Sequence, residues 1–354
     1  EPEDKKLAKE EFSIFSKGGL RVIACAYKKG EQKNFSLAGF VALYDPPRQE
    51  ALRAIREASS AGIRIVMMTG DSDITAKHIA EEIGLISEGE LIVTSSEISG
   101  ISDEKLIEML PRIRVFARMV PQQKLRLVRL YKEAGYVVAV TGDGVNDALA
   151  LAEAHIGIAM GGKGTDVAKE AADIVITDDN LLTIVKAVEE GRGIFDNILK
   201  VVIFLLATNI TEFLFIFLSI VLFLPIPLSP TQILWVNLIG DAAPALALAT
   251  DTKRPNLLKR KPRSITEQIL NGKRIITIGI VSLVFSFALF LLYVIFLNSS
   301  VRLAQMVVFN ALVLGELIVV FVVRGGVFPL NKFLFISIVI SLVVQIIASG
   351  LFFR

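Results

Sequence analysis

The residues best suited to chemistry stand in the run T-G-D-G-V-N-D at positions 141–147. Two carboxylates, Asp143 and Asp147, flank a glycine turn that follows an apolar stretch, and the glycines let the backbone approach a bound phosphate closely. Carboxylate oxygens at such a turn suit Mg²⁺, which keeps several waters and binds one or two carboxylates together with phosphate. This run therefore predicts a magnesium-dependent phosphoryl site.

A second T-G-D run, Thr69, Gly70 and Asp71, ends another apolar stretch. The Thr69 hydroxyl and the free N–H groups of this turn are suited to hold phosphoryl oxygens. Lys124, at the start of a predicted helix, is suited to neutralise charge in a transition state. A lone T-G-D is better explained by a loop with a helix cap. The longer motif, its shorter copy and the lysine together favour one cleft in which Asp143, Thr69 and Lys124 converge.

Carboxylates and amides also interrupt the strongly apolar second half of the chain. They are Asn209, Glu212, Asn237, Asp241, Asn310 and Glu316. Polar groups within membrane spans are costly and usually functional, and a pocket lined by their oxygens suits a hard cation. We expect Glu212 and Asp241 to face each other, with Glu316 completing one site. The alternative, an isolated hydrogen bond between helices, stays open, above all for Asn310, Gln305 and Gln345.

The elements that must position the first group lie in residues 51–176. Helical patterns at 51–62, 71–84 and 122–135 alternate with apolar runs that read as buried strands. This alternation predicts a doubly wound, Rossmann-type parallel sheet, with both T-G-D turns at the carboxyl ends of strands, where such sheets carry their chemistry.

Residues 18–45 have a different pattern, two strand-like runs around a polar segment, which predicts an antiparallel hairpin. The apolar run around Cys25 predicts a buried strand position for this residue. The hairpin ends at Asp45-Pro46-Pro47-Arg48, where two consecutive prolines predict a stiff hinge and a domain boundary.

The second half of the chain predicts a helical membrane domain. Five apolar segments are long enough to cross a bilayer, which takes about 20 helical residues: 198–224, 229–250, 275–297, 302–323 and 333–353. The longest loop between them carries eight Lys and Arg residues, and the positive-inside rule places it, and with it the head, in the cytoplasm. Pro244 predicts local unwinding of the second span. The net charge of +2 indicates no general affinity for nucleic acid.

G-D-G-V-N-D, T-G-D, D-P-P-R and F-A-R-M-V-P-Q-Q-K together resemble the P-type cation ATPases, within the haloacid-dehalogenase-like superfamily. The run I-L-W-V-N-L-I-G-D at 233–241 is most similar to the calcium-pump branch. The resemblance implies a haloacid-dehalogenase-like α/β cytoplasmic domain joined to an α-helical transmembrane bundle. It divides the chain into the end of a nucleotide-binding domain (1–44), part of the phosphorylation domain (45–190) and a transmembrane domain of about five helices (191–354).

The resemblance also implies roles for single residues. Asp143 matches the family's Mg²⁺ ligand, Asn146 and Asp147 support the phosphoryl site, and Thr69 and Lys124 contact the phosphoryl group. Arg21 matches an arginine that contacts ATP, although a solvated strand residue is the alternative, and we assign Arg48 of the D-P-P-R run to nucleotide binding as well. The residues that match cation ligands are Asn209, Glu212, Asn237, Asp241 and Glu316, whereas Gly240 stands where calcium pumps have a threonine ligand.

The chain departs from the family pattern in lacking D-K-T-G-T, whose aspartate is phosphorylated, and T-G-E. We therefore expect the C-terminal part of an ATP-driven cation pump, most similar to those for Ca²⁺, whose missing N-terminal part is its partner and whose tenth helix is absent. Two alternatives are open. One is a truncated, inactive membrane protein that binds Mg²⁺ or other cations or pairs with another chain, and the other is a membrane-tethered phosphatase.

Overall fold

The computed structural model describes residues 2–18, 20–28, 35–43, 46–327 and 331–353. Two compact units are distinct, and each has its own core. The first, the head unit, comprises Glu1–Val188 and Leu258–Ile265, and the second, the membrane unit, comprises Glu189–Leu257 and Thr266–Arg354. The division into three functional domains stays a prediction.

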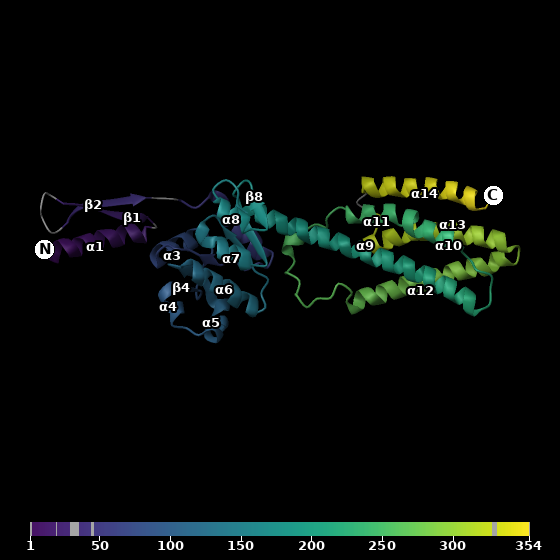
Figure 1. Cartoon of the computed structure of the whole chain (residues 1–354), viewed down its shortest axis with the longest axis horizontal. Helices are drawn as coiled ribbons and strands as arrows, with labels where there is room; N and C mark the ends of the chain where they lie inside the picture. Colours follow the sequence, from purple (N-terminus) through teal and green to yellow (C-terminus); the bar gives the residue numbers. More distant parts are fainter. Residues whose placement is uncertain (1, 19, 29–34, 44–45, 328–330, 354) are drawn as a thin grey trace. The chain divides into compact units, whose positions relative to one another are not determined.

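The head unit begins with a helix and the predicted hairpin (Figure 1). Helix α1 (Pro2–Lys17) precedes strands β1 (Arg21–Tyr27) and β2 (Ser36–Leu43), which pair antiparallel with a bulge at Cys25. Cys25 is exposed, so its predicted burial is wrong. A residue in an apolar strand is buried only when another element covers the face of the sheet on which it lies. The described part of this sheet has only two strands, and the side chain of Cys25 remains uncovered. The polar segment 29–34 and the predicted hinge residue Asp45 lie outside the described residues.

Helices and strands then alternate as the sequence predicts. Their order is α2 (Gln49–Ser60), β3 (Met67–Met68), α3 (Asp73–Glu82), β4 (Leu91–Thr94), α4 (Ser95–Ser99), α5 (Asp103–Met109), η1 (Leu110–Arg112), β5 (Ile113–Ala117), α6 (Pro121–Glu133), β6 (Ala139–Gly142), η2 (Val145–Asp147), α7 (Ala148–Glu153), β7 (Ile156–Met160), α8 (Asp166–Glu170) and β8 (Ile174–Ile176). Local sequence explains several boundaries. Ser72 and Thr165 cap α3 and α8 with their side chains, and Pro121 occupies the first turn of α6, where its missing N–H costs nothing.

The six central strands form two parallel sheets of three strands each, in the orders β3-β5-β4 and β6-β7-β8. The prediction of parallel strands is thus confirmed. The sequence did not predict that they divide into two separate sheets. Apart from Arg114, strand β5 is apolar and buried on both faces, with Ile113, Val115 and Phe116 all 0% exposed. Such a strand needs helices on either side, and α3 and α6 carry buried apolar residues of the clusters on its two faces.

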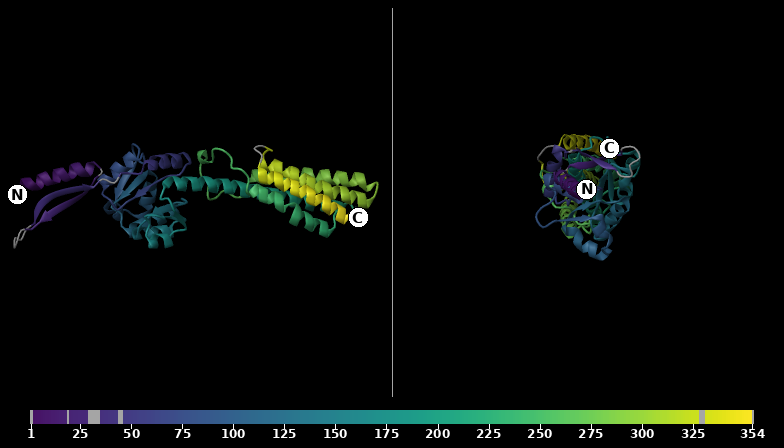
Figure 2. Two further views of the ribbon diagram at one scale, coloured as in Figure 1. Left: turned by 90° about the horizontal axis from the view of Figure 1, so that it is seen from above. Right: turned by 90° about the vertical axis from the view of Figure 1, so that its left-hand side faces the viewer.

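The membrane unit is helical, and its helices run side by side in Figure 1 and in the left view of Figure 2. Its elements are α9 (Leu181–Val221, which starts in the head unit), α10 (Pro230–Trp235), η3 (Val236–Gly240), α11 (Ala242–Ala249), α12 (Gly272–Leu297), α13 (Val301–Arg324) and α14 (Lys332–Phe352). The short helix η4 (Leu257–Lys259) lies at the boundary, with Leu258 and Lys259 in the head unit. Among the described residues, five helical segments are long and apolar enough to cross a membrane, with α10 to α11 counting as one. Large apolar side chains such as Ile276, Leu283 and Val284 remain exposed on α12, as expected for a face that lipid covers.

The second span is interrupted by one π-helical turn, η3, where the sequence predicts unwinding. The N–H of Asp241 donates to the carbonyl of Val236, five residues back, over 2.9 Å. Pro244 has no N–H to offer the carbonyl of Gly240, four residues before it, so regular α-helical bonding cannot pass this point. The helix therefore widens rather than unwinds, and such widened turns are frequent at functional sites.

Candidate functional site

The predicted phosphoryl loop lies at the carboxyl end of β6, as expected. Strand β6 ends at Gly142, and η2 leads into α7. Asp147, the last residue of the loop, stabilises it from within, because its carboxylate accepts a hydrogen bond from the N–H of Gly144 over 3.3 Å. The main chain of Asp143 is held from outside the loop, because its carbonyl accepts from the N–H of Thr165 over 2.8 Å. The side chains of Asp143 and Asn146 are exposed.

Lys124 and Asp147 form the central contact of this site. The Lys124 Nζ lies 2.6 Å from Asp147 Oδ1, and the two side chains are only 12% and 15% exposed. A cation and a carboxylate are therefore held together where water is largely excluded, which strengthens their interaction. Helix α6 places Lys124 one turn after Pro121, so its ammonium group reaches the loop that follows β6.

The second T-G-D turn folds on itself. Thr69 Oγ1 donates to Asp71 Oδ2 over 2.9 Å and accepts from the N–H of Asp71 over 3.1 Å. The turn is joined to the segment leading into α6, because the N–H of Met119 donates to the Thr69 carbonyl over 2.9 Å. Lys124 lies five residues beyond Met119, in the first turns of α6. The main-chain bond of Met119 therefore links the turn that contains Thr69 to the helix that contains Lys124. Convergence of these two side chains on Asp143 stays a prediction.

For the two arginines predicted to bind nucleotide, the structure describes the side chain of Arg48 alone. Arg48 precedes α2, and its Nη1 donates to the carbonyl of Asp179 over 2.7 Å. Arg21 begins β1, and its side chain lies outside the described residues. Their assignment to ATP stays a prediction.

The loop leaves no room for a side chain at position 142. A Cβ on Gly142 would lie 2.5 Å from the Cβ of Asp147, a separation that real atoms do not reach. Gly142→Ala should therefore displace Asp147 from Lys124 and lower the unfolding temperature of the head unit, since overpacking costs about 1–3 kcal/mol. Thermal unfolding measures this effect, and Gly100→Ala is the matched control, because a Cβ there meets only a carbonyl oxygen 4.0 Å away. Equal unfolding temperatures for the two variants would contradict the packing argument.

In the membrane unit, two of the predicted carboxylates have amide or hydroxyl partners. Asn237 Nδ2 donates to Glu212 Oε2 over 3.0 Å, which joins η3 to α9. Thr208 Oγ1 donates to Asp241 Oδ2 over 3.4 Å. Glu212 and Asp241 are 5% and 2% exposed, so both carboxylates lie in the interior of the helical bundle.

The third carboxylate, Glu316 on α13, is 2% exposed and lies close to the interrupted helix. Its Oε2 is 3.7 Å from the position that a Cβ on Gly240 would take. Within the described parts of the chain, no three acidic, His or Cys side chains lie close enough together to enclose a metal ion.

Four oxygens of these carboxylates are buried without a hydrogen-bond partner among the described residues. They are Glu212 Oε1, Asp241 Oδ1 and both carboxylate oxygens of Glu316. Buried polar atoms are nearly always paired, and a buried carboxylate left alone is among the costliest groups in a protein. Because these oxygens belong to three carboxylates within an apolar bundle, this part of the membrane unit is the candidate ligand site.

Asn209 differs from the other predicted cation ligands. Its side chain is exposed, and its Nδ2 donates to the carbonyl of Leu205 in its own helix over 2.6 Å. Thr208, one residue earlier, bonds Asp241 instead. The sequence analysis missed Thr208, although a signal was present, since Thr208 and Glu212 are four residues apart and therefore share a helix face.

Comparison with known proteins agrees with both halves of this description. Residues 225–353 match the family model "Cation transporting ATPase, C-terminus", and residues 9–155 match the model "haloacid dehalogenase-like hydrolase". A calcium-transporting ATPase of Bacillus subtilis is 41% identical over 329 residues, which is 89% of this chain and 37% of that protein. The chain belongs to the P-type cation ATPases. It corresponds to their C-terminal portion and is a multi-pass membrane protein with a haloacid-dehalogenase-like head.

Other relatives of this P-type ATPase carry similar names. Calcium-transporting ATPase 1 of Bacillus cereus is 44% identical over 278 residues, covering 76% of this chain and 31% of the relative. Calcium-transporting ATPase 1 of Lactococcus lactis is 34% identical over 370 residues, covering 100% of this chain and 42% of the relative. The chain thus spans between 31% and 42% of the length of these relatives.

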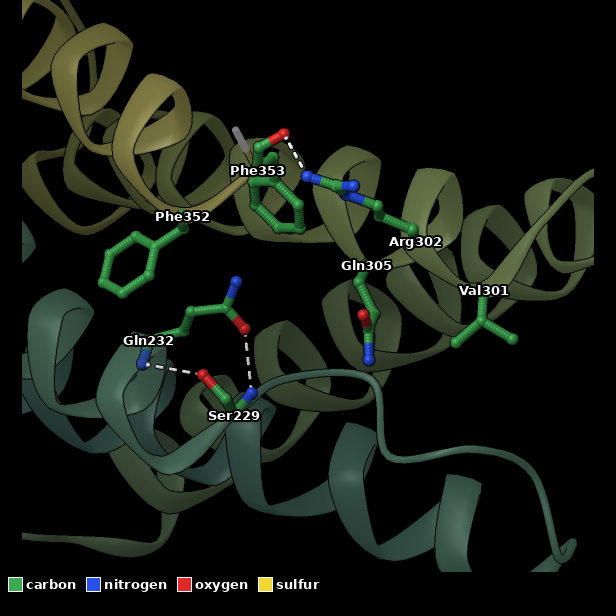
Figure 3. Close-up of a pocket in the computed structure, with 7 residues that line it drawn as sticks. All are labelled: Ser229, Gln232, Val301, Arg302, Gln305, Phe352 and Phe353. Atoms are coloured by element: carbon green, nitrogen blue, oxygen red, sulfur yellow. Dashed lines mark hydrogen bonds between the residues drawn. The ribbon is translucent and has the colours of Figure 1, made fainter.

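A separate pocket in the membrane unit of this P-type ATPase does not involve the carboxylates (Figure 3). It has a volume of about 490 Å³ and lies where α10 and α13 begin and α14 ends. Arg302 donates to the carbonyl of Phe353 over 2.7 Å at its edge. Its lining is Ser229, Gln232, Val301, Arg302, Gln305, Phe352 and Phe353, which includes no acidic residue. We therefore do not assign the cation to this pocket.

Proposed function

We propose that this chain is the C-terminal part of an ATP-driven pump that couples formation and hydrolysis of an aspartyl phosphate to cation transport, with Ca²⁺ as the cation. The observation that carries the proposal is the set of four unpartnered carboxylate oxygens of Glu212, Asp241 and Glu316. A hard cation supplies the positive charge that these groups lack, and oxygen donors are the ligands it prefers.

Calcium is favoured for two reasons. Ca²⁺ takes six to eight oxygen ligands in flexible geometry. Three carboxylates and the amide of Asn237 offer such oxygens from three different helical segments, which do not enclose an ion in this structure and would have to draw together around it. The relatives named above are called calcium-transporting ATPases. Gly240 removes a hydroxyl that calcium pumps have at this position, so we propose that water or a main-chain carbonyl takes its place.

In the head, we propose that Asp143 and Asp147 hold Mg²⁺ and that Thr69, Gly70, Asp71, Lys124 and Asn146 surround the phosphoryl group. The donor types fit this ion, since Asp143 has an exposed carboxylate just after strand β6 and the partly buried Asp147 follows four residues later. When bound, Mg²⁺ neutralises the charge of phosphate oxygens. Lys124 holds Asp147 in place through their 2.6 Å contact and lies ready to pair with a phosphoryl oxygen. Arg21 and Arg48 are proposed to contact ATP.

Helix α9 is proposed as the mechanical link between the two reactions. It runs without interruption from Leu181 to Val221 and carries Glu212. Its first turns contribute Leu182 and Val185 to the apolar core of the head unit. Because a regular helix transmits displacement along its axis, a movement of the phosphorylation domain would reach Glu212 directly.

A phosphorylation assay with labelled ATP tests this proposal. The 354 residues contain no D-K-T-G-T, so we expect the purified chain alone to retain no acid-stable label. The complete pump that contains this chain should retain label when Ca²⁺ is present and lose the label when Ca²⁺ is chelated. Label on the isolated chain would contradict the assignment of the nucleophile to another part of the pump, and label independent of Ca²⁺ would contradict the choice of ion.

A further inference from the structure

A buried cluster of charges in the membrane unit lies outside the candidate cation site. The carboxylate of Asp251, just beyond α11, is its centre. Lys200 Nζ on α9 lies 2.7 Å from Asp251 Oδ2, and Arg324 Nε at the end of α13 lies 3.0 Å from Oδ1 and 3.1 Å from Oδ2. Asp251, Lys200 and Arg324 are 6%, 6% and 7% exposed.

Two amides complete this cluster. Asn197 Nδ2 donates to the main-chain carbonyl of Asp251 over 2.8 Å, and its Oδ1 accepts from Lys200 over 3.0 Å. Asn331, which caps α14, donates to Asp251 Oδ1 over 3.3 Å. Both oxygens of Asp251 are therefore saturated, in contrast to the carboxylates of the candidate cation site.

The contacts keep Asp251 ionised. Burial by itself would raise the pKa of Asp251, but the hydrogen bonds and positive charges of Lys200 and Arg324 outweigh burial and lower the pKa below its usual value. A buried carboxylate held by two cations in good geometry is a specific arrangement, and removal of one partner leaves the other charges buried without compensation.

The cluster joins the three segments that carry the membrane carboxylates. Lys200 and Glu212 are both on α9, twelve residues apart, which is about 18 Å along a helix. Arg324 and Glu316 are both on α13, eight residues or about 12 Å apart. Asp251 follows Asp241 by ten residues, and α11 lies between them.

We propose that Asp251 is a positioning residue for the cation site, and that its contacts with Lys200 and Arg324 set the axial register of α9, α11 and α13 relative to one another. A helix that slips by one residue moves its side chains by about 1.5 Å and turns them by about 100°. Loss of this anchor therefore misplaces Glu212, Asp241 and Glu316 together, although Asp251 touches none of them. The inference rests on the proposed function of these three carboxylates.

The test measures the Ca²⁺ concentration for half-maximal phosphorylation by ATP in the complete pump. Asp251→Asn should raise this concentration by about 10-fold or more, in line with the 10–100-fold losses seen when outer partners of metal ligands are removed. Phosphorylation by inorganic phosphate without Ca²⁺ should stay unchanged, since it does not use the cation site. Asp251→Glu, which keeps the charge, should give a smaller shift.

A purely structural role for Asp251 predicts another result. The amount of active pump would then fall in both phosphorylation assays equally, with no change in the Ca²⁺ concentration for half-saturation, and this result would overturn the inference. Arg324→Lys provides a milder variant in case Asp251→Asn does not fold, because it keeps the charge and loses the guanidinium geometry. An unchanged half-saturation in a folded Arg324→Lys pump would also overturn the inference.

Two further variants separate this inference from the proposed function. Glu267→Gln breaks the ion pair with Arg274, which lies in the same unit, and should leave the Ca²⁺ dependence unchanged. If Glu212→Gln abolishes the Ca²⁺ response while Asp251→Asn does not shift it, the inference fails and the proposed function stands. If Glu212→Gln leaves the Ca²⁺ response intact, the proposed site itself is wrong.

Discussion

Glu212→Gln and Asp241→Asn should each reduce the apparent affinity of the complete pump for Ca²⁺ by about 100-fold or more. Phosphorylation by ATP should therefore be abolished at Ca²⁺ concentrations that saturate the unmodified pump. Each substitution keeps the shape of the side chain but removes a buried negative charge, and each parent residue has one oxygen with no described partner. Direct ligands should matter at least as much as outer partners, whose loss costs about 10–100-fold. Phosphorylation by ATP is measured over a range of Ca²⁺ concentrations in vesicles.

Phosphorylation by inorganic phosphate is the internal control, because it needs the head and not an occupied cation site. It should survive in both variants. Ser282→Ala provides a matched control in the membrane, since it removes a buried hydroxyl that donates to the carbonyl of Ala207 over 3.0 Å and involves no carboxylate. The assignment of the site would be refuted by a normal Ca²⁺ response in both Glu212→Gln and Asp241→Asn.

Lys124→Met should lower the rate of phosphoenzyme formation at saturating Ca²⁺ by about 10²- to 10³-fold, the loss typical of one preorganised electrostatic group. The substitution removes the positive charge that we propose to pair with the phosphoryl group, and it leaves the partly buried Asp147 without its partner 2.6 Å away. Rapid mixing with labelled ATP followed by acid quench measures this rate.

Lys132→Met is the control for the loss of a lysine from the same helix. Lys132 is on α6 as well, but it pairs with Glu153 over 2.9 Å and not with Asp147. Its variant should phosphorylate at close to the normal rate. The Ca²⁺ concentration for half-saturation should be normal in both lysine variants, since neither contacts the membrane carboxylates. Equal rates for Lys124→Met and Lys132→Met would remove Lys124 from the phosphoryl site.

In the head, most of the architecture could be predicted because it depends on local signals. The alternation of amphipathic helices and apolar runs predicts parallel strands, and the T-G-D turns lie at strand ends as expected. The pairing of Lys124 with Asp147 could not be predicted as a contact, because 23 residues separate them along the chain. Exposure of Cys25 was missed for a similar reason, since burial of a strand depends on what packs against it.

In the membrane unit, the five spans follow from length and hydropathy, and the structure confirms them. The choice of partners does not follow from the same signals. Asn209 and Thr208 are neighbours in the sequence, yet Thr208 bonds Asp241, whereas Asn209 bonds its own helix. A helix rotation of about 100° per residue separates these two directions, and only packing against the other helices sets which one faces inward.

The sequence by itself determined the family, the alternating α/β head, the five spans and the three carboxylates that interrupt them. Each of these depends on residue types at short spacing, which the backbone geometry of helices and strands converts into structure. Only the tertiary structure decided that the second span widens at η3, that four carboxylate oxygens are left without partners, and that Asp251 joins α9 to α13. These features depend on contacts between segments far apart in the chain, whose geometry is settled when the helices pack.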